Sequence, residues 1–415
     1  MKEYNHRSLV TISLLALASV AMLSACRRHQ SFLGVTEKTI RLGSVLVLQG
    51  QDEALGNGMR VGIEASLAGE KVQGRSLEIS FKNDYYEPAS ARKATEELLK
   101  EQDIFLALGN VGTPTAQVTL PILAKNNIPA VGFFTGARLL RENAPELIVN
   151  YRAGYGQEIA AVVKMAIASG ITPAEVCAYI QNDSYGLDAL NNLKQTLAQV
   201  GASQDIIDRY DKILESTGDR NNLGAVGVYT RNTPYSNPGY KALKKWEAER
   251  GVKCKLVITA ATYRNLAYFV KISREKGDNW IISALSFTGA DELRWDLEEY
   301  NVTDGIIMTQ VVPLLDSDLP IVESARIALK EDFGLISLEG YIVGKMLLQI
   351  LRDIPGELTR TNFLQQVQRS KFNLGGIPID FTDDDNQGSD LVIVSQLKPQ
   401  GFMEIELDEF ATMFQ

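Results

Sequence analysis

The feature that most constrains the fold is an alternation of short apolar runs with longer helical patterns, which starts at residue 39. In the first part of the chain, the strand-like runs lie at 40–46, 77–81, 105–108 and 130–134. The helical patterns between them lie at 59–68, 88–101 and 116–125. Alternation at this spacing is typical of parallel βαβ units, which build a doubly wound sheet with helices on both faces.

The same rhythm starts again after residue 156, which indicates a second lobe of like architecture. Strand-like runs lie at 176–180, 256–259 and 280–283, and helical patterns lie at 157–168, 187–200 and 266–276. The stretch between 201 and 255 lacks this rhythm, and we expect its asparagine- and proline-containing part, 221–239, to be a surface excursion. Because about 380 residues follow the N-terminal segment, too many for one hydrophobic core, we predict two domains.

The N-terminus carries the features of an export signal. Basic residues precede an almost unbroken apolar run at 9–23, which is shorter than the roughly 20 residues that a membrane-spanning helix needs. The run ends in LSAC, whose cysteine is Cys26, and this ending resembles the lipobox of bacterial lipoproteins. The resemblance implies a signal peptide over 1–25, a diacylglycerol on Cys26 and a lipidated leash over 26–37.

Charge and residue counts exclude several classes of function. The chain has a net charge of −9 and no basic run beyond the leash, so we expect no nucleic acid partner. Its two histidines are His6 and His29, both ahead of the first lobe. Their position removes Ser-His-Asp and Cys-His catalysis and the commonest zinc sites from the folded body. We therefore expect no catalytic residue, no metal site and no cofactor.

Two further cysteines, Cys177 and Cys254, each lie inside an apolar, strand-like segment. We interpret them as unpaired residues of the core. A disulfide between them is the alternative, because an exported protein folds in an oxidising compartment.

The loops that follow the predicted strands hold the candidate ligand-binding residues. In open parallel sheets, ligands bind beyond the carboxyl ends of the strands, where loops converge and helix N-termini present N–H groups. Small hydroxyls, glycines, aromatic rings and a few acids dominate these loops, which lie at 49–52, 83–86, 109–113, 135–137, 182–186, 261–263 and 286–289. Such residues suit a pocket for a polar small molecule.

Eight short motifs stand in these loops or beside the predicted crossings between the lobes. They are LQG at 48–50 with LGNGM at 55–59, NDYYEP at 83–88, GTPT at 112–115, FTGA at 134–137, NYRAGY at 150–155, DSYG at 183–186, TQVVP at 309–313 and SLEGY at 337–341. In this order they resemble the type 1 periplasmic binding proteins, specifically the leucine/isoleucine/valine-binding receptors of ABC importers. The resemblance covers residues 39–405.

The resemblance implies an α/β fold of two doubly wound, Rossmann-like lobes joined by a three-strand hinge, with the ligand in the cleft between them. Lobe 1 would comprise 38–150 and 311–377, and lobe 2 would comprise 151–310 and 378–415. The chain would cross between the lobes near 150–152, 308–312 and 375–379. Lobes hinged in this way close around a ligand, and the importer would recognise the closed form.

Carried over residue by residue, the family's ligand site matches this chain in part. The hydroxyl that receives an amino acid's carboxylate falls on Thr113, beside Gly112 at a predicted helix start. The second hydroxyl position falls on Gly136, beside Thr135. The aromatic residue of the second lobe falls on Tyr185. Further candidates are Asp183, Tyr263 and Phe287, by their place in the strand-end loops, and Tyr155, which ends the motif NYRAGY.

Two departures from the family's pattern leave the ligand open. The aromatic residue of the first loop is Leu55 here, and the acid that grips a ligand ammonium falls near 285–286, where neither residue is acidic. Asp183 or Asp291 would then hold an ammonium, or the ligand carries none. Purely structural roles are the alternatives: Thr113 as a helix N-cap, Asp183 as a turn residue, and the rings as ordinary half-buried aromatics.

These observations predict a lipid-anchored, extracytoplasmic receptor that catalyses nothing and captures a small polar metabolite, an amino acid or a related carboxylate or amide. The resemblance implies an ABC permease as the membrane partner, and we expect a monomer attached to the membrane through its lipid. A ligand-sensing lipoprotein that signals to a membrane partner is the main alternative. A secreted hydrolase that uses paired carboxylates is the other.

Replacing the cysteine of the lipobox tests the anchor. The mature chain should begin at Cys26 and partition into the detergent phase, whereas Cys26→Ala should stay in the aqueous phase, because the acyl chains supply the apolar surface that binds the bilayer. Detergent phase partitioning and mass spectrometry of the N-terminal peptide measure both properties. Membrane association that persists unchanged in Cys26→Ala would contradict the lipoprotein prediction.

Overall fold

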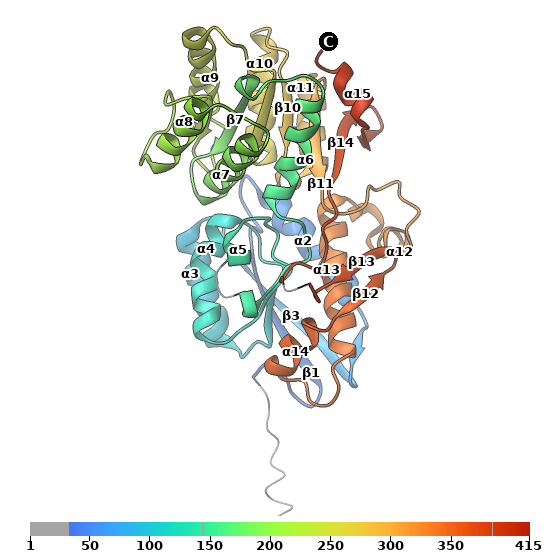
Figure 1. Cartoon of the computed structure of the whole chain (residues 1–415). Helices are drawn as coiled ribbons and strands as arrows, with labels where there is room; N and C mark the ends of the chain where they lie inside the picture. The colour runs from blue at the N-terminus through green and yellow to red at the C-terminus, as the bar shows by residue number, and fades with distance from the viewer. Residues whose placement is uncertain (1–32, 143–144, 384) are drawn as a thin grey trace, which may run out of the picture.

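The computed structural model describes residues 33–142, 145–383 and 385–415. Cys26, the signal peptide and most of the leash lie outside the described residues, so the anchor stays a prediction. The described chain forms two α/β lobes, which stand one above the other in Figure 1. Within the described ranges, no helix is long and apolar enough to cross a membrane.

The lower lobe in Figure 1, lobe 1, is built on a six-stranded sheet with the order β2-β3-β1-β4-β5-β6. Its strands are β1 (Thr39–Leu46), β2 (Lys71–Val72), β3 (Arg75–Asn83), β4 (Leu106–Leu108), β5 (Ala130–Val131) and β6 (Ile148–Val149). All neighbouring pairs are parallel except β2 and β3. Strands β4, β5 and β6 are buried throughout, as expected for strands of a parallel sheet that helices cover on both faces.

The upper lobe, lobe 2, contains a seven-stranded sheet with the order β15-β14-β11-β10-β9-β7-β8. Its strands are β7 (Val176–Gln181), β8 (Val226–Tyr229), β9 (Leu256–Ala260), β10 (Ile281–Ala284), β11 (Ile306–Gln310), β14 (Ile393–Lys398) and β15 (Gly401–Glu404). Strands β7 to β11 pair in parallel, and β14 and β15 extend the sheet in the antiparallel sense. The chain thus enters lobe 2 after β6, leaves it after β11 and returns for β14.

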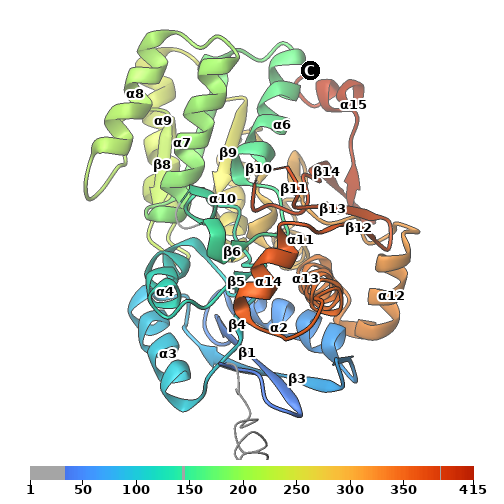
Figure 2. The same ribbon diagram turned by 60° about the horizontal axis from the view of Figure 1, so that its bottom comes forward.

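Helices cover both sheets. In lobe 1 they are α2 (Glu53–Leu67), α3 (Pro88–Glu101), α4 (Thr113–Lys125), α5 (Leu139–Glu142), α12 (Pro320–Leu329), α13 (Leu335–Arg352) and α14 (Arg360–Val367). In lobe 2 they are α6 (Tyr155–Ala168), α7 (Ser184–Gln199), α8 (Gln204–Glu215), α9 (Asn237–Arg250), α10 (Tyr263–Glu275), α11 (Ala290–Tyr300) and α15 (Leu407–Thr412). Figure 2 shows α3 and α4 together on one side of lobe 1, with α13 on the other.

Glycines allow α2 and α13 to pack backbone against backbone. A Cβ atom on Gly62 would lie 2.1 Å from the carbonyl oxygen of Ser337, and a Cβ on Gly340 would lie 2.5 Å from that of Met59. Side chains at either position would therefore push the helices apart. Through this contact α13, which follows the excursion into lobe 2, completes the core of lobe 1.

Three segments of the chain meet where the lobes join. Asn150, directly after β6, forms a parallel bridge with Gln387. The backbone N–H of Ser389 donates to the carbonyl of Tyr151 over 2.9 Å. The Tyr151 hydroxyl donates over 3.0 Å to the carbonyl of Val311, directly after β11. All three connections therefore run side by side at the junction.

The third connection lies further along the chain than the crossing expected near 375–379. At that place the chain forms a hairpin between β12 (Lys371–Leu374) and β13 (Ile377–Asp380). Gly375 and Gly376 form its turn with φ angles of +58° and +108°, which favour glycine. The glycine pair that marks this place in the sequence is therefore a turn signal.

The stretch between 201 and 255, expected to be irregular, contains two helices and a strand. Helices α8 and α9 flank β8, which is buried and pairs in parallel with β7. The interpretation of 221–239 as a surface excursion is therefore wrong for β8 and for the start of α9. A Cβ on Gly227 of β8 would lie 2.4 Å from the carbonyl oxygen of Gly239 in α9. Here glycine permits a strand and a helix to pack closely. In the sequence alone, a glycine with this role looks the same as a glycine in a loop.

Cys177 and Cys254 form a disulfide, so their interpretation as unpaired core residues is wrong. Cys177 lies in β7 and Cys254 lies two residues before β9, and these strands are neighbours, with Cys177 opposite Val257. The two Cα atoms are 5.7 Å apart, within the usual range for a disulfide. The bond ties the strands at a sequence separation of 77 residues.

Removing this disulfide should destabilise lobe 2 without changing its fold. A crosslink that closes a loop of this length restricts the unfolded chain and contributes about 2–4 kcal/mol. We expect Cys177→Ala/Cys254→Ala to lower the free energy of unfolding in urea by that amount. Wild-type protein treated with a reductant should match the double variant. Unfolding midpoints that are equal with and without reductant would contradict the bond.

Candidate functional site

The cleft between the lobes is closed in the structure, and loops at the carboxyl ends of both sheets form its walls. The Tyr263 hydroxyl of lobe 2 donates to the carbonyl of Gln51 in lobe 1 over 2.8 Å. The Arg231 guanidinium, which follows β8, lies 2.9 Å from the carboxylate of Glu87, which precedes α3. Since both pairs join one lobe to the other, they stabilise the closed arrangement.

A chain of three buried hydroxyls crosses the floor of the cleft. Thr113 Oγ1 and Thr135 Oγ1 are 2.7 Å apart, and Thr135 Oγ1 is 3.1 Å from the Tyr155 hydroxyl. Thr113 and Thr135 belong to lobe 1, whereas Tyr155 is the first residue of α6 in lobe 2. The structural alternative for Thr113 does not hold, because Gly112 is the N-cap of α4 and the Thr113 hydroxyl bonds to Thr135.

Two glycines make room for the rings that approach this hydroxyl chain. A Cβ on Gly112, whose φ is +100°, would lie 2.3 Å from the Tyr86 ring. A Cβ on Gly136 would lie 2.7 Å from the Tyr155 ring and 2.8 Å from its backbone nitrogen. Gly136, the counterpart of the family's second hydroxyl, thus allows Tyr155 to supply a hydroxyl in its place.

Aromatic rings from both lobes form the wall above the hydroxyls. The Phe287 ring of lobe 2 lies 4.8 Å from that of Tyr185, 5.4 Å from that of Phe134 and 6.2 Å from that of Tyr86. The Tyr155 and Tyr185 rings are 5.4 Å apart. The structure therefore brings Thr113, Thr135, Tyr155, Tyr185 and Phe287 together, as expected from their place after the strands. Tyr263 lies at the edge of the cleft, where it contacts Gln51.

An ion cluster lies beside this wall, and sequence reasoning missed its member Glu158. Arg152 is fully buried, with its guanidinium 3.9 Å from the Glu158 carboxylate, 3.6 Å from that of Glu339 and 4.8 Å from the Phe134 ring centre. Glu158 accepts hydrogen bonds from the Ser286 backbone N–H at 2.9 Å and from its hydroxyl at 3.0 Å. A carboxylate from α6 thus lies beside Ser286, and its observed partners belong to the protein itself.

A sequence signal for Glu158 did exist. It lies on the face of α6 that also buries Tyr155, Ile159 and Val162. A charged residue on an apolar helix face requires a partner and therefore marks a site.

The third member of the cluster, Glu339, has a shifted pKa. Burial raises the pKa of its carboxyl group to about 7, and the positive charge of Arg152 partly opposes this rise.

Several buried polar atoms of the cleft have no hydrogen-bond partner of normal geometry among the described residues. They are Nε and Nη1 of Arg152, Nε2 of Gln310, the hydroxyls of Tyr185 and Thr288, and both carboxylate oxygens of Asp52. Buried polar groups are nearly always paired in native proteins. Atoms of this kind are suited to bind a ligand or water. Beside the ion cluster, the closed cleft keeps a hollow of about 10 Å³ lined by Phe134, Ser286, Gln310 and Glu339, close to the volume that one water needs.

Asp183 and Asp291 already have partners. The Asp183 carboxylate lies 2.6 Å from Arg231 and accepts from the Tyr185 backbone N–H at 3.1 Å, as the N-cap of α7. The Asp291 carboxylate accepts from the Leu335 backbone N–H at 3.1 Å, a contact between α11 and α13. Their roles as ammonium ligands stay predictions, and the observed contacts are structural.

The loop before α3 is strained and held by its own side chains. Tyr85 and Tyr86 both have φ of +55°, a backbone conformation that costs a non-glycine residue free energy. Asn83 accepts from the Tyr85 backbone N–H at 3.1 Å, and Asp84 accepts from that of Tyr86 at 2.8 Å. Burial raises the pKa of Asp84 from 3.8 to about 7, and the bond from Tyr86 opposes this rise.

The described residues lack the groups that histidine-dependent catalysis and the common metal sites require. They contain no histidine, and within them no group of three or more histidine, cysteine, aspartate or glutamate side chains lies close enough together to hold a metal ion. The arrangement instead combines hydrogen-bond donors, rings and closure by two lobes, which are the properties of a binding site.

Comparisons with known proteins agree with this geometry. Residues 39–213 match a family of periplasmic binding proteins. A possible leucine/isoleucine/valine-binding protein from Rhodopirellula baltica SH 1 is 31% identical in sequence and superposes with a TM-score of 0.80. The match covers 90% of this chain and 97% of that protein. No curated protein matches the chain.

Two more distant structures have the same fold. A branched-chain amino acid ABC transporter protein from Thermus thermophilus with bound valine is 14% identical, with a TM-score of 0.72 over 89% of this chain and 96% of its own. A solute-binding ABC transporter protein from R. palustris in complex with 4-hydroxybenzoate is 17% identical, with a TM-score of 0.71 over 89% and 96%.

Asp84 should make stability depend on pH. Its pKa is higher in the folded chain than in the unfolded chain, so the stability gained by proton uptake is present at low pH and lost as pH rises through about 7. Asp84→Asn keeps the acceptor for Tyr86 but cannot titrate. Its stability advantage over wild type should therefore shrink by on the order of 2 kcal/mol between pH 8 and pH 5, measured by urea unfolding.

Asp380→Asn is the matched control for this titration. Lys371 lowers the pKa of Asp380 to about 2, so this carboxylate is ionised at both pH values. The stability difference between Asp380→Asn and wild type should be the same at pH 5 and pH 8. A difference for Asp84→Asn that is also independent of pH would show that Asp84 does not titrate in this range.

Proposed function

Because the chain belongs to the periplasmic binding proteins of the leucine/isoleucine/valine-binding type, we propose that it is the extracytoplasmic receptor of an ABC importer, and that it captures a small carboxylate or amide between its lobes. This family consists of solute-binding proteins rather than enzymes. The proposal includes a lipid anchor on Cys26, an ABC permease as partner, and a monomeric receptor whose two lobes join at the three connections described above.

The observation that carries the proposal is the hydroxyl chain at the start of α4. Thr113 and Thr135 from lobe 1 meet Tyr155 from lobe 2 at a helix N-terminus, fully buried beneath the Tyr185 and Phe287 rings. A helix N-terminus favours negative charge because its N–H groups and dipole point outward. A carboxylate or another strong acceptor is the group that such a site would bind. Because donors from both lobes contribute, its binding would also favour closure.

The relatives with bound ligands support this choice of chemistry. Valine and 4-hydroxybenzoate, bound by two proteins of the same fold, differ in charge and shape but share a carboxylate. In this chain Nη1 of Arg152, which has no hydrogen-bond partner among the described residues, adds a second place for an acceptor. We therefore propose that the carboxylate or amide end is the feature common to its ligands, and that the Tyr185 and Phe287 rings contact the remainder.

An ammonium on the ligand is not required by this site. Asp183 is neutralised by Arg231, and Asp291 accepts a backbone N–H. Asp52, in the loop after β1, has no hydrogen bond of normal geometry to either carboxylate oxygen among the described residues. Burial raises its pKa to about 6, although Thr262, Arg264 and Arg231 nearby lower it. If the ligand is an amino acid, Asp52 is the acid that we propose for its ammonium.

A thermal-shift screen of amino acids, amides, short aliphatic acids and aromatic acids tests the function. A ligand that binds the folded chain raises its melting temperature by mass action. The ligand that gives the largest shift is then titrated by calorimetry into wild type, Thr113→Ala and Thr119→Ala. Thr113→Ala should weaken binding by about 1–3 kcal/mol, the cost of an unpaired buried polar group.

Thr119→Ala is the matched control, because the Thr119 hydroxyl donates within α4 to the carbonyl of Thr115 and does not face the cleft loops. It should bind the ligand as wild type does. Equal affinity in wild type and Thr113→Ala would place the ligand elsewhere. If no small molecule shifts the melting temperature while a membrane protein binds tightly, the chain is a sensor and not a transport receptor.

A further inference from the structure

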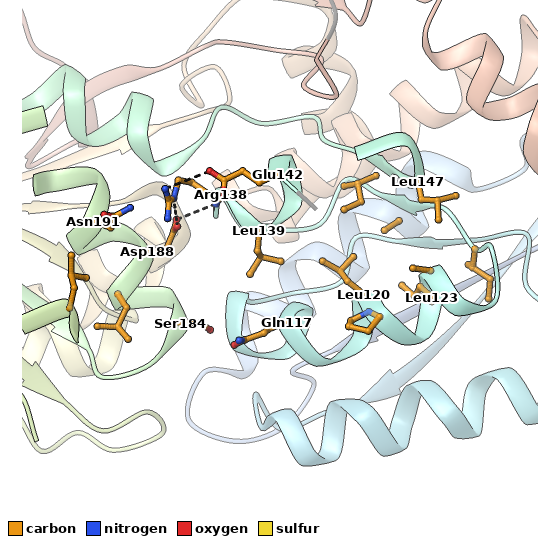
Figure 3. Close-up of a pocket in the computed structure, with 17 residues that line it drawn as sticks. Gln117, Leu120, Leu123, Arg138, Leu139, Glu142, Leu147, Ser184, Asp188 and Asn191 are labelled. Atoms are coloured by element: carbon orange, nitrogen blue, oxygen red, sulfur yellow. Dashed lines mark hydrogen bonds and ion pairs between the residues drawn. The ribbon is translucent and has the colours of Figure 1, made fainter. Parts of the chain in front are cut away.

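A groove outside the hydroxyl-lined cleft has the chemistry of a second binding site. Its volume is about 640 Å³, within the range typical of small-molecule sites. We name it the leucine groove after Leu120, Leu123, Leu139, Leu147, Leu187 and Leu214, which line it. Figure 3 shows leucines from α4 and from the segment around α5 facing each other at one end, and polar side chains at the other.

Both lobes contribute to the leucine groove. Helix α4 and the segment that leads to β6 belong to lobe 1, whereas α7 and α8 belong to lobe 2. Arg138 of lobe 1 closes the polar end by bonding the Asp188 carboxylate of lobe 2 at 3.1 Å. An occupant would therefore contact surfaces that separate when the cleft opens.

The polar end disfavours an anion. Arg138 pairs with Asp188 at 3.1 Å and with Glu142 at 3.5 Å. With the Asn191 amide oriented so that its oxygen faces the guanidinium, Asn191 accepts from Arg138 Nη1 at 3.0 Å and from Nη2 at 2.9 Å. These partners use the donors of Arg138, and the two carboxylates outnumber the single cation. A carboxylate head group would find no cation free to pair with it there, because Arg138 already has its partners, and two negative charges would lie nearby.

Neutral hydrogen-bonding groups remain at the same end. The Ser184 hydroxyl is buried without a hydrogen-bond partner. Pro121 lies inside α4 and has no N–H, so the Gln117 carbonyl one turn earlier lacks its usual helical donor. Ser184 and Gln117 both line the groove, and Figure 3 shows the side-chain amide of Gln117 pointing toward Ser184. One hydroxyl or amide head group could bond to both.

We propose that the leucine groove binds a small uncharged amphiphile, an aliphatic chain with a single hydroxyl or amide head. The chain would lie along the leucines of α4 and α5, and the head would lie between Ser184 and Gln117. Because the lining comes from both lobes, occupancy would favour the closed form and would be coupled reciprocally to binding in the cleft.

Calorimetric titration of the full mature chain with 1-octanol and with octanoate tests the proposal. 1-Octanol should bind one saturable site, and octanoate, with the same chain and a charged head, should bind at least tenfold more weakly. Ser184→Ala, which removes one hydroxyl, should weaken 1-octanol about fivefold. Ala124→Trp, which fills the groove from α4, should abolish binding, whereas Ala248→Trp, at an exposed position of α9, should leave it unchanged.

Three results would overturn the proposal. Octanoate that binds as tightly as 1-octanol would refute the uncharged head group. Binding of 1-octanol that survives in a folded Ala124→Trp chain would place the site elsewhere. If Ala124→Trp fails to fold, Ser184→Ala decides the question, because unchanged 1-octanol affinity in that variant would remove the head-group contact.

Discussion

The guanidinium of Arg152 lies where the two lobes join, and its burial sets a condition that the rest of the cleft must meet. A charge removed from water is stable only when opposite charges and hydrogen-bond acceptors surround it. Glu158 on α6 of lobe 2 and Glu339 on α13 of lobe 1 supply the negative charges, at 3.9 and 3.6 Å. Because the two acids come from different lobes, the ion cluster and the closed cleft depend on each other.

The same requirement explains how the walls of the cleft are built. Hydroxyls, rings and carboxylates can be buried together only when the backbone lets them approach closely, and Gly112 and Gly136 provide that space. Beside Gly112 in the same lobe, Tyr85 and Tyr86 adopt a strained backbone that Asn83 and Asp84 hold in place. Strain and desolvated acids cluster at sites whose geometry is set in advance for a ligand.

Two regions of different polarity thus lie between the same two lobes. The cleft is lined by hydroxyls, rings and charges, whereas the leucine groove is lined mainly by aliphatic side chains and ends in an ion pair whose donors are already used. Helices α4 and α7 take part in both, since Thr113 and Tyr185 face the cleft while Leu120 and Leu187 line the groove. The arrangement of the two lobes therefore sets the shape of both regions.

The sequence by itself determined the features that depend on local period and on strand ends. Alternating strands and helices predict two α/β lobes, and because the carboxyl ends of parallel strands converge, Thr113, Thr135, Tyr155, Tyr185 and Phe287 could be expected to meet. Only the tertiary structure decided which distant residues become partners. Four features depend on contacts between segments far apart in the chain. They are the disulfide of Cys177, the burial of β8, the pairing of Asp183 with an arginine and the pairing of Ser286 with a carboxylate. Periodicity reports which face of an element is buried, but the partner across that face is set by packing, and no local pattern carries that information.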